Sequence, residues 1–156
     1  MADRVNYWKA APEAYRAMAQ LESYVKGCGL EHSLLELVKM RASQLNGCAY
    51  CLDMHSKDAR AAGESEQRLY LLSAWREAPF YSERERAALE WTEALTLVAN
   101  DHVPDDVYER VHPHFTDKEL ADLSLAICTI NSWNRLAMSS RSKVGTYQPK
   151  QATAHS

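Results

Sequence analysis

Apolar residues recur at intervals of three and four along most of the chain, which is the spacing of one face of an α-helix. Only five glycines and five prolines interrupt this pattern, and no segment reads convincingly as a strand. The pattern predicts an all-α, single-domain bundle of about six to seven helices, with a core over residues 12–145 and a frayed polar tail over residues 146–156. The expected long helices cover residues 12–26, 33–44, 48–63, 65–76, 82–99 and 116 onward.

Turn and capping residues set the expected helix boundaries. Gly27 and Gly29 stop the first helix and Gly47 stops the second, because glycine tolerates the backbone conformation that follows a helix end. Ser82 and Thr116 are each followed three residues later by glutamate, a capping-box pattern that opens a helix. Residues 101–113 read as a polar connection with a short helical turn. The apolar face of the last helix is formed by Leu120, Leu123, Ile127 and Ile130.

The expected helix over residues 48–63 carries the most distinctive chemistry of the chain. In Cys48-x-x-Cys51-x-x-x-His55 the two thiols and the imidazole fall on one helical face, because successive residues step by about 100°. Thiols three residues apart on a helix have Cα atoms roughly 5–6 Å apart, which is within the range of a disulfide. An imidazole one turn further on is able to take the proton of a thiol and leave a reactive thiolate. This spacing indicates a thiol redox site.

Glu36, twelve residues before Cys48, is a second candidate site residue. From the preceding helix its carboxylate is able to orient His55 or to receive its proton. An alternative follows from Ser33-Leu34-Leu35-Glu36, which also fits a capping box. In that case the carboxylate only satisfies the start of a helix.

Two further interpretations compete with the redox site. The cysteines and His55 could be packed core side chains, or Cys48, Cys51, His55 and Glu36 could be four zinc ligands. Structural zinc sites usually draw a second ligand pair from a distant segment, and this sequence contains none. The histidines of the polar connection have no cysteine beside them: His102, His112 and His114. We therefore expect no metal site.

Polar and sulfur-containing residues elsewhere favour structural roles. Cys28, between two glycines, is expected to be a loop thiol, and Cys128, in an apolar helix, a packed core thiol. Asn131 and Arg135 lie four residues apart on the last helix, where buried polar groups need partners. We expect them to brace neighbouring helices or a subunit contact.

Composition and charge narrow the class of protein. The 156 residues are 46% hydrophobic, and the net charge is -3 with no basic stretch that could follow a phosphate backbone, which argues against nucleic acid as a partner. No apolar run approaches the roughly 20 residues of a membrane span, and the N-terminus lacks the apolar core of a signal peptide. We expect a cytoplasmic protein, in which four cysteines with one Cys-x-x-Cys pair indicate redox or metal chemistry.

The chain resembles the carboxymuconolactone decarboxylase superfamily, on its alkylhydroperoxidase D-like branch. The resemblance rests on the motif Glu-x11-Cys-x2-Cys-x3-His, formed by Glu36, Cys48, Cys51 and His55, and on the run Arg41-Ala42-Ser43-Gln44-Leu45-Asn46-Gly47 before it. Residues 71–80 and 130–135 also look like family segments, so the likeness covers most of the chain, from about residue 12 to residue 145.

This resemblance implies a helical subunit in a homo-oligomer, commonly a trimer or hexamer, that reduces hydroperoxides without a bound organic cofactor. By this likeness Cys51 is the peroxidatic cysteine, Cys48 is the resolving cysteine, and Glu36 with His55 forms the proton relay. An external dithiol or disulfide reductase then returns the pair to thiols. The best-known pattern of this branch has histidine just before the second cysteine, whereas this chain has Tyr50, a weaker base and a possible accessory residue.

Two other functions remain open at this stage. A decarboxylase of the carboxymuconolactone type shares the fold but typically lacks the cysteine pair, which makes it the weaker interpretation here. A redox-sensing oligomer without catalysis would use the same disulfide to change its assembly.

Overall fold

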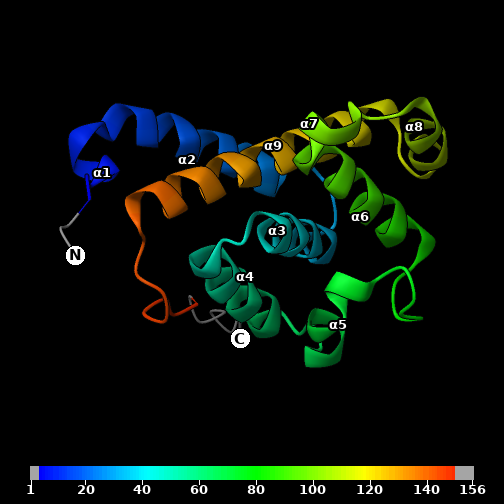
Figure 1. Ribbon diagram of the computed structural model, residues 1–156, viewed down its shortest axis with the longest axis horizontal. Helices are drawn as coiled ribbons and strands as arrows, with labels where there is room; N and C mark the ends of the chain where they lie inside the picture. Colours follow the sequence, from blue (N-terminus) through cyan, green and yellow to red (C-terminus); the bar gives the residue numbers. More distant parts are fainter. Residues whose placement is uncertain (1–3, 150–156) are drawn as a thin grey trace, which may run out of the picture.

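Helices make up all of the regular structure in residues 4–149, the part of the chain that the computed structural model describes (Figure 1). The expected all-α class is confirmed. The α-helices are α1 (Tyr7–Ala10), α2 (Pro12–Gly27), α3 (His32–Asn46), α4 (Ala49–Ala61), α5 (Glu66–Tyr70), α6 (Glu83–Thr96), α7 (Val98–Asp101), α8 (Asp105–Val111) and α9 (Asp117–Ser140). Short 3-10 helices cover Leu72–Ala74 and His112–His114.

The central element is α3, which lies between α9 on one side and α4 on the other (Figure 1). Nine of its 15 residues are buried, so nearly all of its faces contact other helices. One apolar cluster joins α3 to α6 and α9 through residues such as Leu35, Ala88 and Ile127. A second cluster joins it to the segment after α4 through Leu37 and Trp75. Some polar residues on α3 are therefore buried in the interior as well.

The capping residues begin α6 and α9 as the sequence predicts. The Ser82 hydroxyl accepts from the Glu85 N–H and the Glu85 carboxylate accepts from the Ser82 N–H, and Thr116 and Glu119 repeat the arrangement. The four apolar residues expected on the core face of α9 are all buried. Cys128 is exposed, so its assignment to the core is wrong. A step of about 100° beyond the buried Ile127 turns Cys128 away from the core.

The helix expected over residues 65–76 is interrupted. Helix α5 ends at Tyr70, and only one 3-10 turn follows before the chain becomes irregular. The guanidinium of Arg86, on α6, donates to the carbonyls of Trp75, Arg76 and Ala78. Because a side chain satisfies these carbonyls, the segment needs no helical hydrogen bonds of its own. The helix expected to reach residue 99 likewise ends earlier, at Thr96, and the separate α7 follows.

Three asparagines tie the end of α3 to α9, immediately before the cysteine motif. The Asn46 side-chain amide donates to Asn131 Oδ1 at 2.9 Å and to Asn134 Oδ1 at 2.8 Å. Asn134 is fully buried and donates to the Ser43 hydroxyl at 3.0 Å. The expectation that Asn131 braces a neighbouring helix is confirmed, and this brace fixes the chain just ahead of Cys48.

We expect Asn134→Ala to lower the free energy of unfolding by about 1–3 kcal/mol, because Asn46 and Ser43 lose a buried partner. Urea unfolding at neutral pH measures the change. Asn100→Ala, at an exposed position on α7, is the matched control and should leave stability within about 0.5 kcal/mol of wild type. Equal stabilities of the two variants would contradict the bracing role.

Candidate functional site

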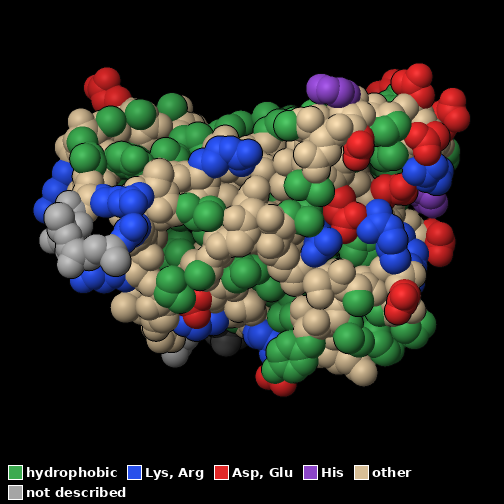
Figure 2. Space-filling view, in the orientation of Figure 1, with side chains coloured by type: hydrophobic (Ala, Val, Ile, Leu, Met, Phe, Trp, Pro, Cys, Tyr) green, Lys and Arg blue, Asp and Glu red, His purple; other side chains and the backbone are tan. Residues whose placement is uncertain are grey.

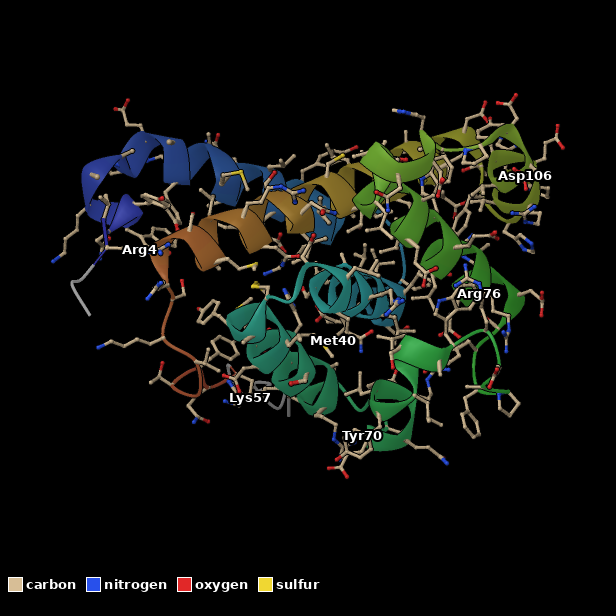
Figure 3. All side chains as sticks on the ribbon, in the orientation of Figure 1. Arg4, Met40, Lys57, Tyr70, Arg76 and Asp106 are labelled. Carbon is tan, nitrogen blue, oxygen red and sulfur yellow. A yellow bond between two sulfur atoms is a disulfide. The ribbon has the colours of Figure 1, made fainter. Side chains whose placement is uncertain are left out.

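The cysteine pair lies at the first turn of α4. Gly47 ends α3 with a φ of +70°, a conformation that favours glycine, and Cys48 is the N-cap of α4. Cys48 and Cys51 form a disulfide with a Cα–Cα distance of 5.3 Å (Figure 3). The Cys51 N–H also donates to Cys48 Sγ at 3.3 Å. The unpaired N–H groups of a helix start favour negative charge, so this position stabilises a thiolate once the bond is reduced.

His55 and Glu36 form a buried pair across α3 and α4. His55 Nδ1 lies 3.1 Å from Glu36 Oε2, and the two residues are only 6% and 5% exposed. Because α3 begins at His32, with Glu31 as its N-cap, Ser33 does not start a capping box. The capping interpretation of Glu36 is therefore wrong, since its carboxylate accepts from the imidazole instead. With Nδ1–H bonded to the carboxylate, Nε2 is the ring nitrogen that remains to take up or give a proton.

A buried lysine extends this pair into a network that sequence reasoning missed. Lys39, 2% exposed on α3, lies 2.7 Å from Glu22 Oε1 on α2 and 3.9 Å from Glu36 Oε1. His32 Nε2 lies 4.0 Å from the same Glu36 oxygen. The spacing of Glu36 and Lys39, three residues apart on one helix, was the available signal, but only the packing of α2 shows that both are buried.

The Glu36 carboxyl is ionised at neutral pH. Burial by itself raises the pKa of this group, because it disfavours the charged form. The hydrogen bond from His55 and the charges of His55, Lys39 and His32 act in the opposite direction and outweigh burial, so the pKa of Glu36 lies below its ordinary value. An ionised carboxylate beside Nδ1 stabilises the imidazolium that His55 becomes when it accepts a proton.

This pKa shift predicts a loss of stability in acid. A carboxyl whose pKa is lower in the folded state stabilises the fold above its unfolded value of about 4.3, and that contribution disappears as the pH falls through the folded value. We expect the stability difference between wild type and Glu36→Gln to be largest near neutral pH and to shrink below about pH 4.3. Urea unfolding at several pH values measures this, with Glu77→Gln at an exposed position as the control. A difference that does not change with pH would contradict the assignment.

A cavity of about 290 Å³ opens beside this network. Cys51, His55 and Glu36 line it, whereas Cys48 does not and is fully buried. Its remaining polar and apolar walls are formed by Trp8, Tyr15, Glu22, Lys26, Lys39, Tyr50, Met54, Asp58, Ile130, Trp133, Ala137, Ser142 and Tyr147. Of the two sulfurs, a small molecule in this cavity therefore meets that of Cys51.

Tyr50 lies among other aromatic side chains. Its ring lines the cavity, and its phenol contributes to raising the pKa of both Tyr15 and Tyr147, for each of which burial is the largest cause. Because the ordinary pKa of tyrosine is already about 10, the phenols of Tyr15 and Tyr147 are protonated at neutral pH. Tyr50 therefore stands near Cys51 among neutral phenols, which can donate hydrogen bonds but do not accept protons readily.

The four residues weighed as zinc ligands are arranged as two separate pairs, a disulfide and an imidazole–carboxylate hydrogen bond. Within residues 4–149 no three His, Cys, Asp or Glu side chains are grouped in a way that could hold a metal ion. In the same range no helix is both long and apolar enough to cross a membrane. Figure 2 shows basic and acidic side chains intermixed on the visible face, with acidic ones gathered around α8.

Comparison with known proteins identifies a family and relatives that match most of this chain. The model of the carboxymuconolactone decarboxylase family matches residues 12–94. The uncharacterized protein YdfG of Bacillus subtilis is 48% identical over 138 residues, which are 88% of this chain and 94% of that protein. A crystal structure of a protein of unknown function from Agrobacterium tumefaciens, provisionally described as the antioxidant defence protein AhpD, has 48% identity and a TM-score of 0.89. The match covers 94% of this chain and all of that one.

A more distant likeness is to the debrominase Bmp8 without ligand. It has a TM-score of 0.76 at 18% identity, and the match covers 88% of this chain and 74% of that one. At this identity the likeness extends to the fold alone.

Proposed function

Because the chain belongs to the carboxymuconolactone decarboxylase family, on its alkylhydroperoxidase D-like branch, we propose that it is a thiol-dependent peroxidase that reduces hydroperoxides through Cys48 and Cys51. The observation that carries the proposal is the buried His55–Glu36 pair one helical turn from Cys51, on the wall of the same cavity. This arrangement supplies a base, a charge that stabilises its protonated form, and a thiol that a substrate can reach.

In the oxidative half of the cycle, His55 Nε2 takes the proton of Cys51, and Glu36 stabilises the resulting imidazolium. The Cys51 thiolate attacks the outer oxygen of the hydroperoxide, and the O–O bond breaks. The departing alkoxide takes the proton from His55 and leaves as an alcohol, while Cys51 becomes a sulfenic acid. The Cys48 sulfur then attacks Cys51, the disulfide forms and water departs. One hydroperoxide has accepted two electrons from two thiols.

In the reductive half, an external dithiol attacks the disulfide and is itself oxidised, which returns both cysteines to thiols. Cys51 is only 2% exposed and Cys48 is fully buried, so the reductant reaches the pair by way of the cavity. Since the cycle needs a supply of reduced thiols, the proposed compartment is the cytoplasm. A trimer or hexamer of this chain is the proposed assembly, which light scattering measures directly.

The test of the proposal is catalytic consumption of a hydroperoxide by wild-type protein in the presence of excess dithiothreitol as the dithiol. We expect many turnovers per subunit, above the uncatalysed reaction. Peroxide-induced disulfide formation with a change of oligomer size and no turnover would favour the redox-sensing alternative. Turnover of a carboxylated lactone by a variant without Cys48 and Cys51 would favour the decarboxylase.

A further inference from the structure

The C-terminal segment does not fray where it leaves the last helix. Residues 145–149, here called the C-terminal strap, lie against α4 beside the labelled Lys57 (Figure 3). Tyr147, within the tail that the sequence predicts to be frayed, is held by hydrogen bonds, and residues 150–156 lie outside the described part of the chain. A set of polar side chains on α4 binds the strap.

Three hydrogen bonds hold the strap on α4. The Gly145 N–H donates to Asp53 Oδ2 at 3.0 Å, and the φ of +89° at this residue favours glycine. Lys57 Nζ donates to the Tyr147 carbonyl at 3.0 Å. The Tyr147 hydroxyl donates to Asp58 Oδ1 at 2.7 Å. Because backbone and side chain are both bonded, the position of the Tyr147 ring is fixed rather than left to solvent.

The ring fixed in this way forms part of the wall of the cavity that contains Cys51. Burial and the hydrogen bond to Asp58 raise the pKa of Tyr147 to about 12, so its hydroxyl stays a donor throughout the neutral range. Other aromatic walls come from α2 and α9, where the rings of Tyr15 and Trp133 lie 5.6 Å apart between centroids. The ring of the exposed Trp8 lies against that of Tyr15, with centroids 3.5 Å apart and planes tilted by 30°.

The size of this cavity exceeds what hydrogen peroxide needs. At about 290 Å³ it is several times the roughly 30 Å³ that one water molecule occupies in the liquid. Aromatic rings in its wall offer apolar area and stacking to an organic group, whereas the linked polar side chains of His55, Glu36 and Lys39 form another part of the wall. A hydroperoxide with a compact aromatic group can place its O–O bond at the polar end and its ring among the aromatic walls.

We propose that Tyr147, held by the C-terminal strap, is a specificity-determining residue that favours aromatic hydroperoxides over hydrogen peroxide at Cys51. This inference rests on the proposed peroxidase function and adds the substrate class to it. Tyr147 contacts the organic group and takes no part in the proton transfer, so its loss affects aromatic substrates and spares the smallest peroxide.

The experiment measures the second-order rate constant for loss of the two thiols when reduced protein meets cumene hydroperoxide or hydrogen peroxide. For Tyr147→Ala we expect the ratio of the two constants to fall about tenfold, through the cumene hydroperoxide constant alone. Tyr147→Phe keeps the ring, and the strap keeps its bonds from the Gly145 N–H to Asp53 and from Lys57 to the backbone carbonyl of residue 147. The ratio of the two rate constants for this variant should therefore stay within about twofold of the wild-type ratio. The matched control is Tyr24→Ala, which also removes a phenol bonded to an aspartate, Asp122, but lies outside the cavity.

A Tyr147→Ala ratio equal to that of wild type, or an equal fall in both constants, would overturn the specificity role and leave the peroxidase function standing. If neither peroxide oxidised the thiols of the wild-type protein, the proposed peroxidase function would be overturned, and the inference with it. The two failures are therefore distinguished within one set of measurements.

Discussion

Cys51→Ser lowers hydroperoxide turnover by roughly a thousandfold or more, which is the largest effect that we expect from any substitution in this chain. A serine hydroxyl is not ionised near neutral pH and cannot replace the thiolate as nucleophile. Steady-state peroxide consumption with excess dithiothreitol measures the loss. Cys128→Ser is the matched control, because Cys128 is a free, exposed cysteine on α9 that does not line the cavity. Its activity should remain close to that of wild type.

Cys48→Ser separates the two steps of the oxidative half. Cys51 still attacks the peroxide in this variant, but no thiol is available to displace the sulfenic oxygen. One equivalent of peroxide should therefore leave a sulfenic acid on Cys51, which mass spectrometry detects after trapping with dimedone. If Cys51→Ser kept its activity, or if the trapped oxygen were found on Cys48 in the Cys51 variant, the assigned roles would be wrong.

His55→Gln lowers the rate of Cys51 oxidation by about 10²–10⁴-fold, because glutamine can accept a hydrogen bond but does not accept a proton at neutral pH. The buried geometry with Glu36 is the reason for expecting so large an effect. Stopped-flow measurement with one peroxide from pH 5 to 9 gives both the rate and its pH profile. In wild type the pH profile of the Cys51 oxidation rate should reflect proton transfer from Cys51 to His55. In the variant the rate should rise only as the Cys51 thiol ionises without that base.

His112→Gln is the matched control for this prediction. His112 also pairs with a carboxylate, with Nε2 2.9 Å from Asp117 Oδ1, but its side chain is 40% exposed and does not line the cavity. Its rate and pH profile should equal those of wild type. If His55→Gln and His112→Gln behaved alike, the proton relay would have to be abandoned even if Cys51 remained the nucleophile.

The elements that the sequence predicts well are those set by local spacing. The motif of Cys48, Cys51 and His55 lies within eight residues, so helical periodicity alone places it on one buried face. The capping boxes at Ser82 and Thr116 are also local and are confirmed. For Glu36 the local pattern at Ser33 suggested a helix cap, and only the packing of α3 against α4 shows the contact with His55.

The features that were missed depend on contacts between distant segments. Tyr147 meets Asp58 across 89 residues, and no periodicity connects the two. Arg86 interrupts an expected helix by binding carbonyls eight to 11 residues earlier in the chain. Lys39 would be read as a solvated residue, yet Glu22 from α2 pairs with it in the interior. In each case a side chain satisfies a polar group that local rules assign to water or to the backbone.

The central claim is that peroxide oxidises Cys51 to a sulfenic acid and that Cys48 then forms a disulfide with it. The most direct measurement maps the thiols of reduced protein after addition of one equivalent of hydroperoxide. Free thiols are blocked within seconds, and mass spectrometry then locates the oxidised cysteines. The account predicts rapid loss of two hydrogens, assigned to a Cys48–Cys51 bond, with Cys28 and Cys128 still blocked as free thiols. If Cys48 and Cys51 remained free thiols under these conditions, the result would contradict the account.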